Sequence, residues 1–505
     1  MGVIIRQGVV SGIILYAGAA LGFVISVLLF PKTLGTEVYG FSQWLVFTAY
    51  TLSMISLFGL NSVTIKYFPY FREDTDSQKR FLSLILSLST ITLALLTLAA
   101  VLFEPLIVRL FTDERSEAFV AQYYYLIPLM VIIITYFELL KSFASALFRP
   151  RFPIFLAEVF SRLLTLALIG LFFWGWIDTD LFIKLFALKN GINVLILAVF
   201  LRSLGALRIS RQGWRIFKRP IFREMMNFSL FTIFSQIGNR IITTIDILMV
   251  SPLLGFQLGG VYTVFMLIAS VITMPHMGIS TITSPLIAQA MKDKDLVKVH
   301  QIYRQTTINN TILAILLFVG IWANIDNAIT MLGPEYEVGR TAAILLAFGQ
   351  LVHVMNGYNG YIIIHSPYYR FDLILKLSTC VITATSNYFF IQWYGLAGAA
   401  LATAATLILV NLASQAFIYR KFGFHPFSIN TLKALVIGGI SLAAGFWLPD
   451  SFPNFIVDII VRSGLITVIY GSLTLGWKVS GDINNFAADQ ILNYTGKDPT
   501  YLRVE

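Results

Sequence analysis

MNFSLFTIFSQIGNRIITTIDILMVSPLLGFQLGGVYTVFMLI, residues Met226–Ile268, is apolar enough to cross a membrane, yet it carries Arg240 and Asp246. An earlier stretch, LLFPKTLGTEVYGFSQW at 28–44, contains the same spacing of leucine and glycine residues. The positions that correspond at one constant offset are Leu34 and Leu254, Gly35 and Gly255, and Gly40 and Gly260. The match predicts an internal repeat whose second copy begins with this run. Repeats in transporters place the substrate site between the two halves, near the middle of the membrane.

The composition excludes an ordinary soluble protein. Of the 505 residues, 57% are hydrophobic and 12% are charged, whereas soluble globular domains carry about 25% charged residues. The net charge of +10 does not indicate a nucleic-acid partner, because the basic residues stand in short loops between apolar runs. The single cysteine, Cys380, excludes an intrachain disulfide. We therefore expect an all-α polytopic membrane protein.

Apolar runs of about 20 residues are long enough to cross the hydrocarbon core as helices. Their continuity favours helices over the alternating strands of a barrel. The run Val9–Phe30, which follows Arg6, is longer than the apolar part of a signal peptide, so we interpret it as the first span. About fourteen transmembrane helices are expected, at roughly 7–30, 40–62, 81–103, 117–146, 153–174, 180–201, 226–250, 258–287, 306–325, 339–363, 371–391, 395–418, 432–449 and 454–477.

The basic residues fall on alternate sides of these spans. Of the 36 Lys and Arg residues, 27 lie in one set of loops and termini, 6 in the other set and 3 inside spans. Basic loops stay in the cytoplasm, so we expect both termini to be cytoplasmic and the protein to lie in the cytoplasmic (inner) membrane. The loops on the opposite side are too short to hold a folded catalytic domain.

The repeat and the loops together predict five parts. A basic connection that follows six spans looks like a linker between two six-helix halves. We expect an N-terminal lobe at 1–203, a cytoplasmic linker at 204–225, a C-terminal lobe at 226–420, two additional helices at 421–480 and a cytoplasmic tail at 481–505.

Three basic residues lie near the middle of predicted spans: Arg162, Lys189 and Arg240. Charge is costly there and usually faces a bundle interior or a cavity. We interpret the three as candidates for a cationic cavity that holds an anionic headgroup, since guanidinium groups bind phosphate through paired hydrogen bonds. For Arg162 a structural alternative stays open, because Glu158 one turn earlier could neutralise it. Arg240 does not share a helix face with Asp246 six positions later, so its partner must come from elsewhere.

Other polar residues in the predicted spans are candidates for ion coupling or for lining a cavity. Asp246 and Glu158 could take up a coupling ion, or could be structural partners of arginines. The residues that could line a cavity are Asn193, Asn239, His276 and Asn356. Two i,i+4 pairs at the outer ends of spans are interpreted as solvated and without a special role: Asp180 with Lys184, and Asp458 with Arg462.

Enzyme motifs do not stand out in the sequence. We find no Walker A sequence, zinc-ligand spacing, serine nucleophile elbow or dinucleotide fingerprint. We therefore expect neither catalysis nor a cofactor or resident metal. The energy for transport would come from an ion gradient, the membrane potential or the substrate gradient.

Four stretches resemble the corresponding helix ends of the polysaccharide exporters (oligosaccharide flippases) in the multidrug/oligosaccharidyl-lipid/polysaccharide (MOP) superfamily. They are LFPKTLGTEVYGFSQW at 29–44, TTIDILMVSPLLGFQLGGVYTVF at 243–265, ITMLGPEYEVGRTAAILLAFGQ at 329–350 and TSNYFFIQWYGLAGAALATAAT at 385–406. The resemblance covers roughly residues 5–420. It implies two six-helix lobes in a V-shaped arrangement. It also implies alternating access that moves an oligosaccharide on undecaprenyl diphosphate, a precursor of polysaccharide or lipopolysaccharide, to the outer face of the membrane.

The resemblance also implies a coupling cation (H+ or Na+), contact with membrane lipid and other polysaccharide assembly proteins as partners. A lipid II flippase and a small-molecule/cation antiporter of the same superfamily are the alternatives within transport. The first two predicted spans contain no arginine, whereas the lipid II flippases carry basic residues there, and the first span has no acid. A membrane glycan polymerase or ligase is a different class. A third class, an assembly scaffold, predicts that Arg162, Lys189 and Arg240 pack against acids.

Overall fold

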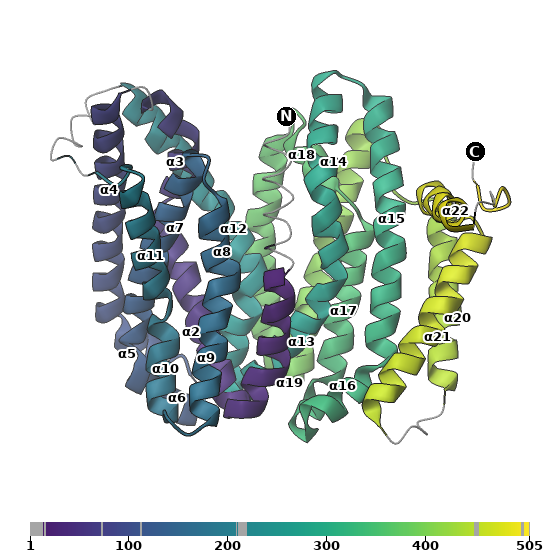
Figure 1. Ribbon diagram of the computed structural model, residues 1–505, viewed down its shortest axis with the longest axis horizontal. Coiled ribbons are helices and arrows are strands. Elements are labelled where there is room, and N and C mark those ends of the chain that lie inside the picture. Colours follow the sequence, from purple (N-terminus) through teal and green to yellow (C-terminus); the bar gives the residue numbers. More distant parts are fainter. Residues whose placement is uncertain are drawn as a thin grey trace. The chain divides into compact units, whose positions relative to one another are not determined.

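The computed structural model describes residue 14 and residues 17–71, 74–111, 114–208, 210, 220–448, 454–495 and 499–503. Nearly all of these residues are helical, and no strand occurs among them. The all-α class predicted from the apolar runs is therefore confirmed. The helices pack into two compact units, Met1–Thr263 and Val264–Glu505 (Figure 1).

The first unit contains long helices joined by short turns, and residues 17–23 are helical before its first labelled element. In chain order its elements are the π-helix η1 (Val24–Leu29), α2 (Phe30–Leu57), α3 (Leu60–Tyr67), the 3-10 turn η2 (Phe68–Phe71), α4 (Thr75–Leu102), α5 (Glu104–Val108), α6 (Glu114–Tyr123), α7 (Leu126–Ala146), α8 (Arg151–Phe155), the π-helix η3 (Leu156–Phe160), α9 (Ser161–Phe173), α10 (Thr179–Leu188), α11 (Asn190–Ser203), α12 (Pro220–Leu254) and the first half of α13 (Phe256–Ser270).

The second unit begins within α13 and ends with a short helix that packs against the end of a span. Its elements are η5 (Val271–Thr273), α14 (Met274–Lys292), α15 (Leu296–Ala323), α16 (Ile325–Leu332), η6 (Pro334–Gly339), α17 (Arg340–Met355), α18 (Asn359–Ile364), α19 (Tyr369–Phe422), α20 (Ile429–Trp447), α21 (Phe455–Gly476) and α22 (Gly481–Thr495). The amide of Asn484 in α22 donates to the carbonyl of Leu475 at 2.8 Å, which holds α22 at the end of α21.

Eleven helices in the described ranges are long and apolar enough to cross a membrane, or twelve if the bent helix α12 is counted. Two of the eleven, Ala17–Leu57 and Arg370–Phe422, are interrupted by a glycine with non-helical backbone, Gly35 and Gly395 respectively. Dividing each of these two at its glycine and counting α12 brings the number to the fourteen spans expected from the sequence. The chain is a multi-pass membrane protein.

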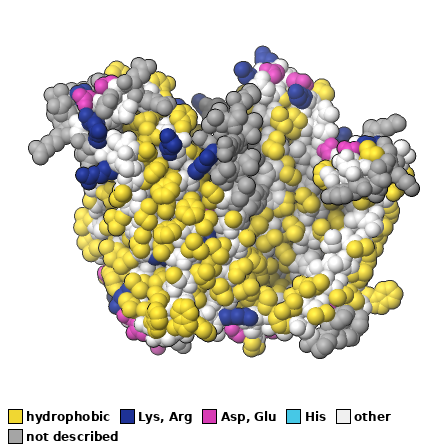
Figure 2. All heavy atoms as spheres, viewed as in Figure 1, with side chains coloured by type: hydrophobic (Ala, Val, Ile, Leu, Met, Phe, Trp, Pro, Cys, Tyr) yellow, Lys and Arg dark blue, Asp and Glu magenta, His cyan; other side chains and the backbone are white. Residues whose placement is uncertain are grey.

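The outer faces of the helices are apolar, as contact with lipid requires. Figure 2 shows hydrophobic side chains along the sides of the helices in view, with Lys and Arg mostly toward the helix ends. On α4, four exposed residues lie on one helix face: Ile91 (57% exposed), Leu95 (63%), Leu98 (57%) and Leu102 (67%). In water such a stripe would be unfavourable, so it marks a lipid-facing surface.

The repeated glycines meet inside the first unit. A Cβ added to Gly40 would lie 1.9 Å from the carbonyl oxygen of Phe256, and one added to Gly260 would lie 2.0 Å from that of Thr36. Thr36 and Phe256 are 220 residues apart, as are Gly40 and Gly260, so the contact between α2 and α13 is symmetric. The Phe256 ring packs edge-on against Phe41, with 5.0 Å between centroids. The glycine stretches of the two predicted repeats therefore contact each other through equivalent residues.

Glycine is also required where the spans turn. Gly35 and Gly255 have φ of +83° and +88°, while Gly175 and Gly395 have φ of +73° and +56°. Side chains with a Cβ rarely adopt this left-handed region. Each pair is again separated by 220 residues, so the repeat extends to the connections that follow the fifth and eleventh predicted spans.

Gly260→Ala is expected to destabilise the fold by about 1–3 kcal/mol, because the added methyl group overlaps the Thr36 carbonyl and forces the backbones apart. Gly320→Ala is the matched control: a Cβ at Gly320 in α15 meets no neighbouring atom within 4 Å, and alanine is the better helix former. Thermal unfolding in detergent should give a lower Tm for Gly260→Ala alone. Equal Tm values for the two variants would contradict the close contact.

Helix α12, the predicted seventh span, packs on α2 and α3 of the first unit. The side-chain amide of Gln236 donates to the Ser62 hydroxyl at 2.9 Å and to the Asn61 amide oxygen at 3.3 Å. The compact units therefore divide after Thr263 and not at the linker 204–225. The five-part division describes the internal repeat and stays a prediction. The segment expected as a tail contains α22.

The pair Asp458 and Arg462 is buried, so its interpretation as a solvated pair is wrong. The two residues are 5% and 4% exposed. Arg462 donates to Asp458 at 3.0 and 3.1 Å and to the carbonyl of Gly445 at 2.6 Å, and Asn327 also donates to Asp458. An i,i+4 spacing shows that two side chains share a helix face, but it does not show which way that face points.

Candidate functional site

Arg162 lies at the start of α9, directly after the π-helix η3 that contains Glu158. Its Nη2 is 3.0 Å from Glu158 Oε2, so the local ion pair considered from the sequence forms. A Cβ on Gly18 would lie 2.7 Å from Arg162 Nη1, and one on Gly22 would lie 2.5 Å from Nε. These two glycines of the first span leave the space that the guanidinium fills. Its Nη1 is buried and has no hydrogen-bond partner among the described residues.

Arg240 begins the second segment of α12, after a bend of 45° between Pro220–Gly238 and Arg240–Leu254. Its guanidinium carbon is 5.4 Å from the ring centroids of both Phe47 and Tyr50. Aromatic faces attract a cation at this distance. Within the described ranges Arg240 has no ion pair with a carboxylate, and its buried Nε has no hydrogen-bond partner.

Tyr50 of α2 connects the two arginines. Its ring faces Arg240, and it lines a small cavity with Phe137, Ala157 and Ser161, which are the sequence neighbours of Glu138, Glu158 and Arg162. We call the following residues the Tyr50 cluster: Tyr50, Glu138, Glu158, Arg162 and Arg240. Glu138 is paired with Lys141 at 3.0 Å, and Glu158 is paired with Arg162. Arg240 is thus the cation of the cluster that lacks a carboxylate.

A small cavity of about 20 Å³ lies beside the Tyr50 cluster, and Tyr50, Ser161, Asn190 and Asn193 supply its polar lining. Ser161 donates to Asn190 Oδ1 at 2.8 Å, and Asn193 Nδ2 reaches the same oxygen at 3.3 Å. Asn193 Oδ1 is buried and unpartnered within the described part of the chain. The cavity has room for about one water molecule. It is too small for a headgroup.

Lys189 does not line this cavity; it lies at the junction of α10 and α11. Its Nζ is 3.4 Å from the centre of the Phe186 ring. That ring packs against Phe30 and Phe182, with centroids 5.3 and 6.0 Å away. The ammonium group therefore rests on an aromatic face, which is a weaker partner than a carboxylate.

Asp246 is held by a tyrosine, apart from the Tyr50 cluster. The hydroxyl of Tyr262 donates to Asp246 Oδ2 at 2.9 Å, and Asp246 is 5% exposed. This contact gives Asp246 a tyrosine partner, and both roles expected for it, ion coupling and pairing with an arginine, stay predictions. The side chain of Asn239 lies outside the described residues. No group of three or more His, Cys, Asp or Glu residues that could hold a metal occurs in the described ranges.

His276 and Asn356 belong to a buried polar network in the second unit. The His276 ring stacks on Tyr358 with 4.5 Å between centroids, and Tyr303 donates to the Asn356 carbonyl at 3.2 Å. Further members of the network are His353, Asn310, Asn359, Asn411 and Gln415. These residues come from α14, α15 and α17–α19 and include no Lys, Arg, Asp or Glu. Such a neutral network is typical of hydrogen bonding between helices.

Four polar residues of the first-unit site are absent from those expected on sequence grounds: Tyr50, Glu138, Ser161 and Asn190. Glu138 carried a usable signal, since it is an acid inside the predicted fourth span and intramembrane acids are rarely incidental. Tyr50 carried none, because a tyrosine in an apolar run is equally well explained by packing. Only the folded chain brings α2 against α12 and so places Tyr50 beside Arg240.

Comparison with solved structures shows what this fold is similar to. A structure titled "Lipid II flippase MurJ, inward closed conformation" has a TM-score of 0.75 at 14% identity, covering 96% of this chain and 100% of that one. An inward-facing multidrug resistance MATE family transporter of the MOP superfamily has a TM-score of 0.59 at 15% identity, over 81% and 94%. An outward-facing transporter of that kind has a TM-score of 0.50 at 16% identity, over 82% and 95%. At these identities the likeness shows the fold alone.

Comparison with family models shows to which protein family the chain belongs. A search of curated proteins finds no match. The model described as "Polysaccharide biosynthesis protein" matches residues 4–291, and the MatE model matches residues 232–363. The first match covers more than half of the 505 residues. The chain therefore belongs to the polysaccharide biosynthesis protein family, the polysaccharide exporters within the MOP superfamily of membrane transporters and flippases.

Proposed function

We propose that this protein moves an oligosaccharide linked to undecaprenyl diphosphate from the inner to the outer face of the cytoplasmic membrane by alternating access. The observation that supports this function most is the excess of cations in the first unit. Lys141 and Lys184 lie within its spans and are paired with Glu138 and Asp180. Of the three candidate cations Arg162, Lys189 and Arg240, only Arg162 has an acid within ion-pair distance in the described ranges.

A diphosphate is the anion that this arrangement suits. Charged side chains in a span are costly unless paired or hydrated. In the described part of the chain, Arg240 and Lys189 rest on aromatic rings and have no ion pair. Arginine can bind phosphate oxygens through two parallel hydrogen bonds, and the unpartnered Nε of Arg240 and Nη1 of Arg162 are donors of the required kind. The neutral network of the second unit offers no comparable charge.

The lipid II flippase is the alternative that a specific observation favours, because the fold likeness to MurJ covers nearly the whole chain. Against it, the described part of the first two spans contains no arginine. At Gly18 and Gly22 the first span instead makes room for Arg162 of α9. The cation near the first span is therefore supplied by the fifth predicted span. The scaffold alternative is weakened, because neither Lys189 nor Arg240 packs against an acid in the described ranges.

The lipid that accumulates in cells without the protein distinguishes the oligosaccharide substrate from lipid II. In cells that lack it, undecaprenyl-diphosphate-linked oligosaccharide should accumulate on the inner face and be protected from a membrane-impermeant sugar oxidant added outside. Accumulation of lipid II with normal surface glycan would replace the proposal by the lipid II alternative. Unchanged pools of both lipids would contradict both substrates and leave the small-molecule antiporter.

A further inference from the structure

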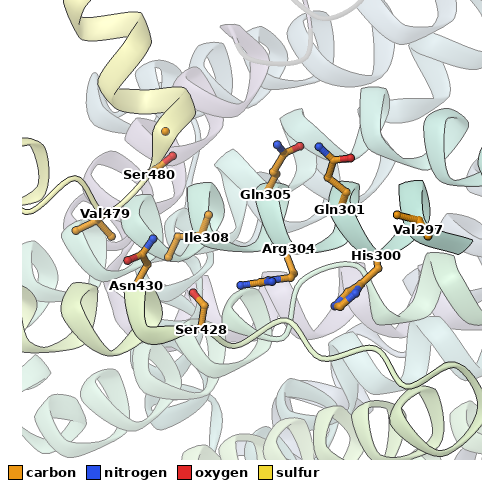
Figure 3. A pocket seen from close by; sticks show the side chains of 11 residues that line it. Val297, His300, Gln301, Arg304, Gln305, Ile308, Ser428, Asn430, Val479 and Ser480 are labelled. Carbon is orange, nitrogen blue, oxygen red and sulfur yellow. The ribbon is translucent and has the colours of Figure 1, made fainter. Parts of the chain in front are cut away.

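A second polar site lies in the other unit, at the ends of its helices. It is a pocket of about 460 Å³ between the first turns of α15, the start of α20 and the turn before α22 (Figure 3). Its lining includes Val297, His300, Arg304, Gln305, Ser428, Asn430 and Gly481. The sequence places all three segments in basic loops expected on one side of the membrane, and the fold brings them together.

The charge in this pocket favours an anion. In Figure 3 the Arg304 guanidinium points toward Asn430 and Ser428, and Arg304 has no ion pair in the described part of the chain. Ser428 caps α20, and Gly481 begins α22, so the N-termini of two helices with 19 and 15 residues open on the same pocket. Helix N-termini carry partial positive charge that attracts phosphate. The hydroxyls of Ser428 and Ser480 each already accept one N–H of the first turn. The imidazole of His300, stacked on Phe424 at 4.9 Å, adds a further polar group to the wall.

The pocket is built by contacts that do not use Arg304. Asn309 of α15 accepts from the Ser480 hydroxyl at 2.5 Å and donates to Asp482 at 2.8 Å. This bridge fixes the turn before α22 onto α15. It also holds one oxygen of the Asp482 carboxylate, and Asp482 does not line the pocket. The guanidinium therefore stays available for a ligand from outside the protein.

The surroundings indicate that the anion belongs to a lipid. Beginning at the pocket, α20 exposes Ile429 (67%), Leu432 (56%) and Val436 (45%), which lie on one helix face. Val297 of the pocket wall is 81% exposed. An apolar stripe that starts beside a cationic pocket offers separate places for an acyl chain and a phosphate. Basic pockets between helices at the cytoplasmic surface recognise anionic lipid headgroups in this way.

We propose that the α15–α20–α22 pocket binds the phosphate group of a membrane lipid, with the acyl chain along the apolar face of α20. This site is separate from the cations of the first unit and does not depend on the transported substrate. By contacting both α15 and the turn before α22, the phosphate would tie α22 to the bundle.

Binding of short-chain lipids to the purified full-length protein in detergent tests the site. The probes are dihexanoyl phosphatidic acid, dihexanoylglycerol (which lacks the phosphate) and inorganic phosphate. We expect the phosphatidic acid to bind more tightly than either of the others. Arg304→Gln should weaken its binding about ten-fold, as expected for loss of a charge-assisted contact. Lys298→Gln is the matched control, since Lys298 is an exposed cation of α15 that does not line the pocket.

A second variant tests whether weaker binding comes from the pocket itself and not from a change in folding. Gln305 lines the pocket and is exposed, so Gln305→Glu adds a negative charge there with little effect on packing. It should also weaken binding of the phosphatidic acid. The proposal is overturned if Arg304→Gln binds as tightly as Lys298→Gln. It is also overturned if dihexanoylglycerol binds equally well, or if inorganic phosphate alone binds.

Discussion

Replacement of Arg240 by glutamine is expected to reduce export of the surface glycan by at least about ten-fold while leaving the amount of protein in the membrane unchanged. Loss of one charge-assisted contact to a buried phosphate costs about 1.5–3 kcal/mol, which corresponds to a factor of about 10 or more. Arg240 is the better test than Arg162, because removal of Arg162 also leaves Glu158 without its partner. Export is measured as surface glycan in cells that carry only the variant.

Two further variants define what Arg240 contributes. Arg109→Gln removes an exposed arginine from the same unit and should leave export normal. Arg240→Lys keeps the charge but loses the paired N–H donors of the guanidinium group. Intermediate export is expected if two of those donors bind the phosphate. Normal surface glycan in a protein with both Arg240 and Lys189 replaced by glutamine would refute the cationic site.

Arg462→Ala is expected to destabilise the second unit by about 3–5 kcal/mol, the cost of leaving one member of a buried ion pair without its partner. Arg462 joins α21 to α20 through the Gly445 carbonyl, and Asp458 joins α21 to α16 through Asn327. Loss of the guanidinium leaves the Asp458 carboxylate buried with one neutral partner. The effect should appear as a large fall in the temperature of unfolding and in the yield of folded protein.

The matched control is Lys184→Ala. Lys184 pairs with Asp180 at the same i,i+4 spacing and a distance of 2.6 Å, but the side chains are 40% and 42% exposed. Water and mobile neighbours replace a lost partner at such a site, so only a small change is expected. Equal losses of stability for Arg462→Ala and Lys184→Ala would show that the burial of Asp458 and Arg462 does not hold.

The sequence was sufficient for those parts of the site that depend on neighbours in one helix. Glu158 and Arg162 are one turn apart, so their ion pair could be anticipated, and it forms. The partners of Arg240 and Asp246 could not be anticipated. Phe47 and Tyr50 reach Arg240 from α2, and Tyr262 reaches Asp246 from α13. Contacts between helices depend on rotation and tilt, which the spacing within one apolar run does not encode.

The run at Met226–Ile268 shows the same difference between what the sequence predicts and what only the folded chain decides. By itself the sequence determined that this run spans the membrane, because no aqueous surface tolerates so many apolar side chains. It also predicted that the run repeats the first spans, because Leu34, Gly35 and Gly40 recur as Leu254, Gly255 and Gly260 at one offset. The structure adds the reason for the glycines, which lie at left-handed turns and at a close helix contact. Tertiary structure alone decided that α12 packs in the first unit and that Arg240 stacks on aromatic rings, with no ion pair among the described residues. The physical reason is that backbone and lipid constraints leave local patterns in a chain, whereas partners for a buried charge come from residues far away in sequence.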